Sequence, residues 1–338
     1  MFKVNLKKYS LLFLMGIGMG ISLFNTAFAE VNAVKPKYAV YSKDMYNGPG
    51  SLGGVNSPEV TNADGEHMLS GGEMRFLTNK GSDSQQLSAV LKSSDGKIVV
   101  VDGGVSADTD HLLQNIKELG GYVDAWLITH PQQDHVGALA EILNNRSTEI
   151  DIRNIYYNFH ELEWYQEVDP EECGIVFVLN DALSKYPQDR VHGEIAKGNV
   201  IELSDKLSIR VMNDPIKMND LYAVNNSSVM YDICIDGKHV IILGDMGPVA
   251  GRQLMDEGVL DGITADFVQI SHHGQNGVDE EFYKRLNPKN CIWPTTKWLY
   301  NVQTGNAFGF KTNETKMWID KLNTEHNYTT KDEDVIIF

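Results

Sequence analysis

Histidine and aspartate side chains stand in three short segments of the sequence, each where a strand is expected to give way to a loop. They are His130, Asp134 and His135 in "HPQQDH", Asp245 in "LGDMG", and His272 and His273 in "SHHG". Imidazole nitrogens and carboxylate oxygens that converge at about 2.0–2.2 Å bind ions such as Zn²⁺. Loops held between rigid elements can aim such groups into one cleft. The sequence therefore predicts a metal site built from three distant segments.

Hydrophobic patterning predicts the elements that position these groups. Apolar runs predict strands at 123–130, 207–213 and 266–274, a hairpin over 227–245 that turns at "DGK", and an earlier hairpin turn at "SSDGK". Helical spacing is expected over residues 111–121, 136–145, 279–288 and 313–323. The aromatic segment 154–200 has no regular period and is expected to be irregular. Paired strands interleaved with helices predict an α/β protein with mixed sheets and outer helices.

The order of the motifs resembles that of the metallo-β-lactamase superfamily. In this family an HxHxDH signature is followed by an "NNxS" strand, then by "GD" and "HHG". Here the same order reads "HPQQDH", "NNSSVMYDI", "LGD" and "SHHG". Within the family, the chain resembles in particular the extracellular hydrolase domain of ComEC-type DNA-uptake proteins and their secreted single-domain relatives. The resemblance covers about residue 74 to the end and implies a four-layer αββα sandwich with a metal cleft.

The resemblance implies roles for the residues of the first motifs. His130 would bind a first metal ion, whereas Asp134 and His135 would bind a second. Asp245 would bridge the two ions. Asp134 and Asp245 are the expected catalytic residues, because they would hold the ion and orient the attacking water. A bound ion lowers the pKa of its water to about 7 and stabilises negative charge that develops on oxygen.

The other positions of the family pattern leave choices open. His273 is the preferred last ligand of the second site, and His272 is the alternative. Asp102, in "VVVDGG", resembles the residue that orients a ligand histidine from behind it. The chain departs from the pattern at Gln132, where the family has a histidine, and Asn226 falls where another first-site ligand is expected. Amides are weaker ligands than imidazole, so the first site is expected to be weakened.

Charge and hydropathy divide the chain into three parts. Three lysines near the N-terminus precede the apolar run "SLLFLMGIGMGISLFN", and "AFA" precedes Glu30. This pattern is typical of a secretory signal peptide over residues 1–29, with an uncleaved membrane anchor as the alternative. Residues 30–73 are rich in Gly, Pro and Asn and are expected to be extended. Residues 74–338 are expected, from the resemblance, to form the hydrolase domain. We therefore expect a secreted or cell-surface protein with no stable membrane span after cleavage.

The net charge of the chain indicates which classes of substrate are favoured. The 338-residue chain has a formal net charge of -17. Loss of the signal peptide removes three of the 29 basic residues, which leaves 26 against 46 acidic residues. An acidic surface repels phosphate backbones, so long nucleic acid is not the expected substrate. A small or cell-wall-linked phosphodiester fits better. The three cysteines lack metal-binding spacing, and a disulfide framework would normally need more of them.

The sequence thus predicts a secreted metal-dependent hydrolase that cleaves a phosphodiester or other phosphoester. The expected cofactor is zinc, as one or two ions, with manganese or iron as alternatives. A lactam, ester or amide hydrolase of the same fold is a second interpretation. A non-catalytic cell-surface binding protein on a degenerate scaffold is a third. Aromatic residues of the middle segment, Tyr157, Trp164 and Tyr165, are candidates for a substrate wall over the cleft, with core packing as the other interpretation.

Overall fold

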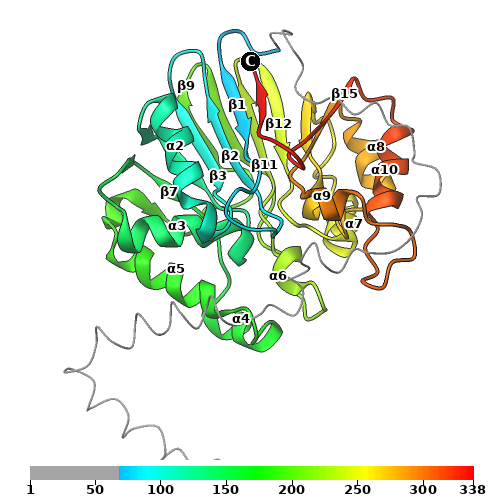
Figure 1. The fold of residues 1–338 in the computed structure, drawn as a ribbon, viewed down its shortest axis with the longest axis horizontal. Coiled ribbons are helices and arrows are strands. Elements are labelled where there is room, and N and C mark those ends of the chain that lie inside the picture. Colours follow the sequence, from blue (N-terminus) through cyan, green and yellow to red (C-terminus); the bar gives the residue numbers. More distant parts are fainter. Residues whose placement is uncertain (1–67) are drawn as a thin grey trace, which may run out of the picture.

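Apolar runs of the sequence form the inner strands of two sheets in the computed structural model, which describes residues 68–338 (Figure 1). Neighbouring residues of a strand point to opposite faces. In β3 (Ile98–Asp102), Ile98 and Val100 pack against helices, whereas Val99 and Val101 pack between the sheets. A run that is apolar throughout is therefore buried on both faces, as expected for a strand covered on both sides.

The first sheet has the strand order β16-β1-β2-β3-β5-β7-β8. Its strands are β1 (Glu73–Phe76), β2 (Ser88–Lys92), β3, β5 (Ala125–Leu127), β7 (Ile155–Tyr156), β8 (Val191–His192) and β16 (Val335–Ile337). The pairs from β3 to β8 are parallel, and the pairs from β16 to β3 are antiparallel. The carboxyl ends of β3 and β5 consequently lie at the same edge of the sheet.

The second sheet has the order β15-β14-β13-β12-β11-β10-β9. Its strands are β9 (Val200–Ser204), β10 (Leu207–Val211), β11 (Tyr231–Ile235), β12 (Lys238–Ile242), β13 (Phe267–Gln269), β14 (Asn290–Trp293) and β15 (His326–Thr329). The pairs from β9 to β12 are antiparallel, and those from β12 to β15 are parallel. β12 and β13 therefore also end at one edge. Two short strands, β4 (Tyr122–Val123) and β6 (Asp151–Ile152), pair separately.

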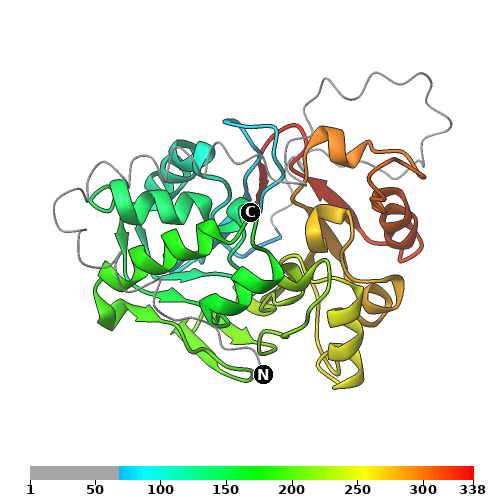
Figure 2. The ribbon, with the colours of Figure 1, turned by 90° about the horizontal axis from the view of Figure 1, so that it is seen from below.

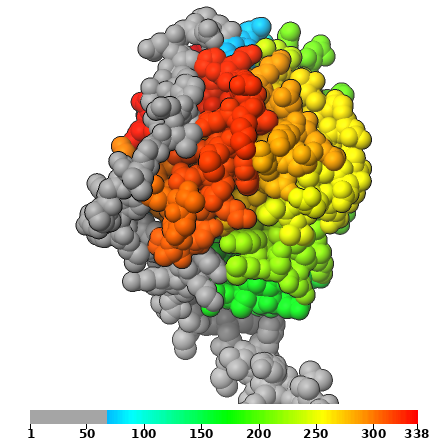
Figure 3. Space-filling model, turned by 90° about the vertical axis from the view of Figure 1, so that its right-hand side faces the viewer, coloured from blue at the N-terminus to red at the C-terminus, as the bar shows by residue number. Residues whose placement is uncertain are grey.

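Helices cover the outer face of each sheet (Figures 1 and 2). The first sheet is flanked by α2 (Thr109–Leu119), α3 (Gln133–Asn145), α4 (Leu162–Val168) and α5 (Gly174–Lys185). The second is flanked by α7 (Pro248–Asp256), α8 (Glu280–Leu286) and α10 (Thr312–Asp320), which form the yellow-to-red face in Figure 3. Two short helices, α6 (Ala223–Asn226) and α9 (Lys297–Tyr300), lie in loops. This arrangement confirms the predicted four-layer αββα sandwich.

Both predicted hairpins are confirmed. β2 and β3 pair around the "SSDGK" turn, and β11 and β12 pair with Ile235 opposite Lys238. The two residues between them, Asp236 and Gly237, have φ angles of 49° and 80°. Positive φ at both central positions matches the twist of the flanking strands. The Asp-Gly pair therefore fixes the register of this hairpin.

The prediction of an irregular segment over residues 154–200 was wrong, because α4 and α5 lie within it. In α5, the buried residues Ile175, Val176, Leu179 and Leu183 recur at helical spacing and pack onto the core beside α3. The predicted signal peptide and the extended segment fall outside the described residues, apart from the last positions before β1. Within residues 68–338, no helix is both long and apolar enough to cross a membrane.

Candidate metal centre

Four side chains converge at the edge of the sandwich where β3, β5, β12 and β13 end. They are Asp134 and His135 in the first turn of α3, Asp245 after β12, and His273 after β13. One ligand atom of each lies within 4.8 Å of the others. His273 Nε2 is 3.2 Å from Asp245 Oδ2 and 3.3 Å from Asp134 Oδ2, and His135 Nε2 is 3.2 Å from Asp245 Oδ1. The carboxyl ends of parallel strands thus bring together residues from both halves of the chain.

The chemistry of these four residues fits a divalent metal ion. His135 Nε2, His273 Nε2 and Asp245 Oδ1 are buried, and their contacts of 3.2–3.3 Å within the cluster are ion pairs without hydrogen-bond geometry. An unpaired buried polar atom costs about 1–3 kcal/mol, so three at one point require an explanation. Two imidazoles and two carboxylates form a donor set typical of zinc, iron or manganese sites. A single ion within this group would satisfy all three atoms.

Hydrogen bonds behind the ligands fix the imidazole orientations. The Asp102 carboxylate is fully buried and accepts hydrogen bonds from His135 Nδ1 at 2.7 Å and from the backbone N–H of Thr129 at 2.7 Å. His273 Nδ1 donates to the carbonyl oxygen of Pro294 at 2.8 Å. Each imidazole therefore turns Nε2 toward the cluster. The structure places Asp102 where the sequence suggested, directly behind a candidate ligand.

The backbone around the last motif is strained. His272 and His273 have φ angles of 51° and 54°, a left-handed conformation that is unfavourable for residues other than glycine. Asp102 shares it, with a φ of 60°. Gly274 follows, and a Cβ atom there would lie 2.6 Å from the Trp293 ring. Such strain often occurs at functional sites. Here it turns His273 inward to the cluster and leaves His272 on the wall beside it.

His130 lies beside the four-residue cluster, with its ring centroid 4.1 Å from that of His135, and is hydrogen-bonded to residues outside the cluster. His130 Nδ1 lies 3.1 Å from the Thr129 hydroxyl and 3.3 Å from the Ser228 hydroxyl. Gln132 Oε1 can only accept a hydrogen bond, so His130 Nε2 is the donor to it at 3.0 Å. A donating Nε2 has no lone pair for a metal. His130 and Gln132 are therefore hydrogen-bonded to each other and do not point free ligand atoms at a metal ion.

Asn225, rather than Asn226, faces this part of the site. Asn225 Nδ2 donates to Gln132 Oε1 at 2.7 Å and lies 3.5 Å from His272 Nε2. Asn226 instead accepts from the backbone N–H of Gly247 at 2.9 Å and donates to Asp220. The structure thus corrects the suggestion of Asn226 as a weak ligand. The two residues are consecutive in the short helix α6, so they point in different directions.

Electrostatics set the protonation of the cluster. Burial opposes a positive charge on His273, but Asp245 and Asp134 outweigh burial and raise the pKa of His273 to about 9. His135 behaves alike, because Asp245 and Asp102 raise its pKa well above the usual range despite burial. An ion that binds there must displace these protons, so metal binding is expected to strengthen with rising pH. Burial lowers the pKa of His130 to about 3, so its imidazole is neutral.

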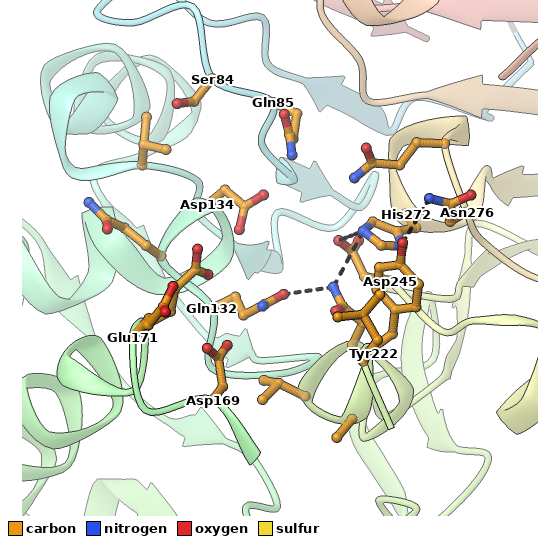
Figure 4. Close-up of a pocket in the computed structure, with 18 of the residues that line it drawn as sticks. Ser84, Gln85, Gln132, Asp134, Asp169, Glu171, Tyr222, Asp245, His272 and Asn276 are labelled. Carbon is orange, nitrogen blue, oxygen red and sulfur yellow. Dashed lines mark hydrogen bonds and ion pairs between the residues drawn. The ribbon is translucent and has the colours of Figure 1, made fainter. Parts of the chain in front are cut away.

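A cavity of about 470 Å³ opens beside the cluster (Figure 4). Asp134, Asp245 and His272 line it, and His272 Nδ1 is buried there without a hydrogen-bond partner. The loop between α4 and α5 supplies Asp169 and Glu172 to one side. Burial, and then the neighbouring carboxylates of Asp169 and Asp134, raise the pKa of Glu172 to about 8. Sequence reasoning missed these carboxylates, which belong to no motif.

The suggested aromatic wall lies elsewhere. Trp164 and Tyr165 are part of α4, and their side chains are buried in the core. Tyr157 packs against the same core. Among the described residues, the aromatic side chains that line the cavity are Tyr222, Phe308 and Phe310. The helix turns Trp164 and Tyr165 inward, which spacing could have indicated if the segment had been recognised as helical. The core-packing interpretation therefore applies to Trp164 and Tyr165.

Comparison with known proteins agrees with this geometry. Residues 81–290, more than half of the chain, match the family model of the metallo-β-lactamase superfamily. The chain belongs to this superfamily, and the resemblance inferred from the motifs is confirmed. Its fold is that of a superfamily hydrolase, with a His/Asp group that could hold a metal ion.

Particular relatives can also be named. The chain is 28% identical over 182 residues to ComE operon protein 3 of Bacillus subtilis (strain 168), across 53% of this chain but only 20% of that protein. The CmlA beta-hydroxylase E377D mutant superposes with a TM-score of 0.51 at 11% identity, covering 79% of this chain and 53% of that chain. The metallo-beta-lactamase fold protein YhfI from Bacillus subtilis is 9% identical, with a TM-score of 0.46, and the match covers 78% of this chain and 98% of that one. At such low identities, the superposition on the CmlA beta-hydroxylase shows the fold alone.

Proposed function

We propose that this protein is an exported hydrolase that uses one divalent metal ion, with zinc as the first candidate, to cleave a small phosphoester. The observation that carries the proposal is the set of unpaired, buried ligand atoms of His135, Asp245 and His273, next to a cavity that Asp134 and Asp245 line. A bound ion would supply a water of lowered pKa and would stabilise negative charge on the reacting group.

The residues of this chain would divide the remaining work. Asp134 is the ligand whose side chain is partly exposed, at 22%, and it lines the cavity, so its carboxylate is placed to orient a water and accept its proton. Asp245 is buried, and its two oxygens face His135 and His273. Its role is to fix the geometry of the ligands. His272 lines the cavity, and its role would be to contact the substrate.

The first metal position of the family is proposed to be closed in this chain. The Gln132 amide oxygen accepts from Asn225 at 2.7 Å and from His130 at 3.0 Å. A metal ion there would have to break both hydrogen bonds and gain only weak amide ligands in return. One ion per chain is therefore expected.

The test of the metal proposal compares two variants. We expect purified protein to hold about one equivalent of zinc, manganese or iron by elemental analysis. His135→Ala should lose most of that metal and all activity, because it removes a ligand. Gln132→Ala should retain the metal, because Gln132 lies outside the cluster. Equal metal content in both variants would contradict the assignment of the ligands.

A specific observation favours a second candidate function. Among the described residues, neither Lys nor Arg lines the cavity, so this part of the lining offers no Lys or Arg to neutralise a phosphoester anion. An uncharged lactam, ester or amide would not need one. Turnover of bis-p-nitrophenyl phosphate but not of a chromogenic cephalosporin would favour the phosphoesterase, and the reverse result would favour the lactam, ester or amide hydrolase. Absence of bound metal and of any turnover would instead favour the non-catalytic binding protein.

Export is proposed from the sequence of the N-terminus. The apolar run with its preceding lysines and the "AFA" before Glu30 are the features that support cleavage of a signal peptide. Mass spectrometry of the protein from culture medium or cell wall should find a chain that begins near Glu30. An intact Met1 start in the membrane fraction would count against export.

A further inference from the structure

The lining of the cavity changes from polar to apolar toward its opening. Asp245, His272 and Gln275 line it and are at most 5% exposed. Leu221 and Phe308 also line it, and they are 67% and 40% exposed. Side chains that line a cavity and are this exposed lie at its mouth. Apolar side chains at the mouth of a polar pocket are suited to hold the apolar part of a ligand.

Phe308 lies on a loop, residues 301–311, whose backbone is fixed by the Asn306 side chain. Asn306 Oδ1 accepts hydrogen bonds from the backbone N–H groups of Phe308 at 3.0 Å and Phe310 at 3.2 Å. Asn306 Nδ2 donates to the carbonyl oxygens of Gln303 at 2.9 Å and Phe310 at 2.8 Å. The Phe308 ring stacks on the Phe310 ring, with centroids 5.5 Å apart, and Phe310 is only 8% exposed. The exposed ring is therefore held in place by its own loop.

Leu221 is placed at the mouth by the residue that follows it. The backbone N–H of Tyr222 donates to Asp220 Oδ1 at 3.1 Å, which fixes the start of α6. The Tyr222 ring meets the His272 ring edge-on, with centroids 5.7 Å apart, and His272 Nε2 is 3.7 Å from Asp245 Oδ2. Figure 4 shows Tyr222 beside His272 and Asp245. Leu221 therefore extends from a fixed position close to the metal centre.

Two consecutive residues after the "SHHG" motif connect both sides of the mouth to the metal centre. The carbonyl oxygen of Gln275 accepts a hydrogen bond at 2.7 Å from the backbone N–H of Lys311, at the end of the first loop. The Asn276 side chain donates to the Tyr222 hydroxyl at 3.2 Å. Both apolar side chains are thus carried by backbone that is tied to the last metal motif. Groups that are already positioned cost less to order when a ligand covers them.

We propose that Leu221 and Phe308 form an apolar clamp that holds an alkyl group of the substrate while the ester lies at the metal centre. The proposal rests on the proposed function, because the reacting group must lie beside Asp134 and Asp245 for its apolar part to reach the mouth. It deepens that function by naming the substrate class, an ester with one polar, hydrolysable end and one apolar end.

The experiment compares p-nitrophenyl methyl phosphate with p-nitrophenyl hexyl phosphate on metal-loaded protein. The two esters have the same charge and the same leaving group and differ only in the length of the alkyl chain. We expect kcat/KM to be higher for the hexyl ester by about tenfold or more, since each buried methylene contributes about fourfold. Leu221→Ala and Phe308→Ala should each reduce this preference. Val249→Ala truncates an apolar side chain that is 57% exposed but outside the cavity, and it should leave the preference unchanged.

Binding separates this inference from the proposed function. The methyl and hexyl esters of methylphosphonic acid lack the nitrophenyl leaving group and can be titrated by calorimetry. If neither nitrophenyl ester is hydrolysed but the hexyl phosphonate binds more tightly, and Leu221→Ala and Phe308→Ala reduce the difference, the apolar clamp stands and the phosphoesterase proposal falls. Equal turnover of both esters together with equal binding of both phosphonates would overturn the apolar clamp and leave the phosphoesterase intact. Absence of turnover with equal binding would overturn both.

Two further outcomes would assign the apolar side chains another role. A preference for the hexyl ester that survives both Leu221→Ala and Phe308→Ala would place the alkyl chain elsewhere and overturn the apolar clamp. Light scattering of wild type and variants tests the other occupant, a second copy of this chain. A dimer that Leu221→Ala dissociates, with the hexyl preference unchanged, would make this surface an interface between copies and would also overturn the apolar clamp.

Discussion

Gln132 is the residue at which this chain departs from the family's histidine pattern, and it lies outside the metal cluster. Its amide oxygen is engaged by His130 and Asn225, and all three side chains are satisfied without an ion. The other half of the centre differs, because His135 and His273 leave their Nε2 atoms unpaired. The amide of Gln132 therefore leaves the first metal position with its hydrogen bonds made, whereas the second position keeps nitrogen atoms that are free to bind a metal ion.

Gln132→His should therefore create a second metal position. An imidazole at this place would remove the amide that holds His130 Nε2, and it would restore the family's histidine. Isothermal titration with zinc should show a second equivalent that wild-type protein lacks. Asn225→Ala provides the control, because it removes a hydrogen bond to Gln132 but adds no imidazole. Unchanged stoichiometry in Gln132→His would mean that residue 132 does not face a metal position.

Glu172 gives a pH dependence whose sign can be worked out. Burial and nearby carboxylates raise its pKa from 4.5 to about 8 in the folded protein. Between these values the folded state binds the proton more tightly than the unfolded state, so this group makes stability fall as pH rises. Glu172→Gln should remove that fall. The melting temperature of metal-free Glu172→Gln should exceed that of wild type by a few degrees at pH 9, at about 2–4 °C per kcal/mol.

The same comparison at pH 4, where Glu172 is protonated in both states, should show little difference between the two proteins. Glu163→Gln, at an exposed position, should follow wild type at both pH values. A melting temperature of Glu172→Gln that stays equal to wild type at pH 9 would show that the carboxylate is solvated rather than crowded.

At the scale of elements, the strands were predictable and the middle helices were not. Runs such as "KIVVVDGG" read as strands because both of their faces are buried, and Asp-Gly turns fixed the hairpins. Helix α5 had a helical period at Ile175, Leu179 and Leu183, but the preceding aromatic cluster obscured it. The direction of Asn225 and Asn226 depends on where α6 begins within its loop, which local sequence does not specify.

Substitution of Trp164 tests whether α4 contributes to core packing or to substrate choice. Its side chain is 3% exposed and packs in the core cluster, and the residue does not line the cavity. Trp164→Ala should cost about 3–5 kcal/mol of stability and lower the melting temperature by many degrees, with every substrate affected alike. Phe308→Ala is the matched change on the cavity, since Phe308 is 40% exposed. It should alter kcat/KM for selected substrates and leave the melting temperature nearly unchanged. A selective loss of activity in Trp164→Ala at wild-type stability would reverse this assignment.

At the scale of the whole molecule, the sandwich explains why distant motifs meet. The parallel strands β3 and β5 of one sheet and β12 and β13 of the other end at the same edge. The site residues lie at or shortly after the ends of these strands: Asp102 at the end of β3, Asp134 after β5, Asp245 after β12 and His273 after β13. The order of motifs was therefore enough to predict the fold and the cluster. It could not predict that the loop between α4 and α5 lines the cavity, because that loop is positioned by packing of α5 and carries no motif.

The overall charge and the cavity together predict that duplex DNA is not a ligand. The chain without residues 1–29 carries 46 acidic and 26 basic residues, and within residues 68–338 no Lys or Arg lines the cavity. A protein that binds duplex DNA neutralises phosphates with Lys and Arg, and its affinity then falls steeply as salt rises. We expect metal-loaded protein to leave the fluorescence anisotropy of a labelled duplex unchanged at micromolar concentrations and low salt, and not to degrade the duplex. Glu163→Gln should behave in the same way, because one surface charge does not alter the sign of the field. Binding by wild type that weakens steeply with added salt would reveal a basic groove outside the cavity and would contradict the expectation of a small substrate.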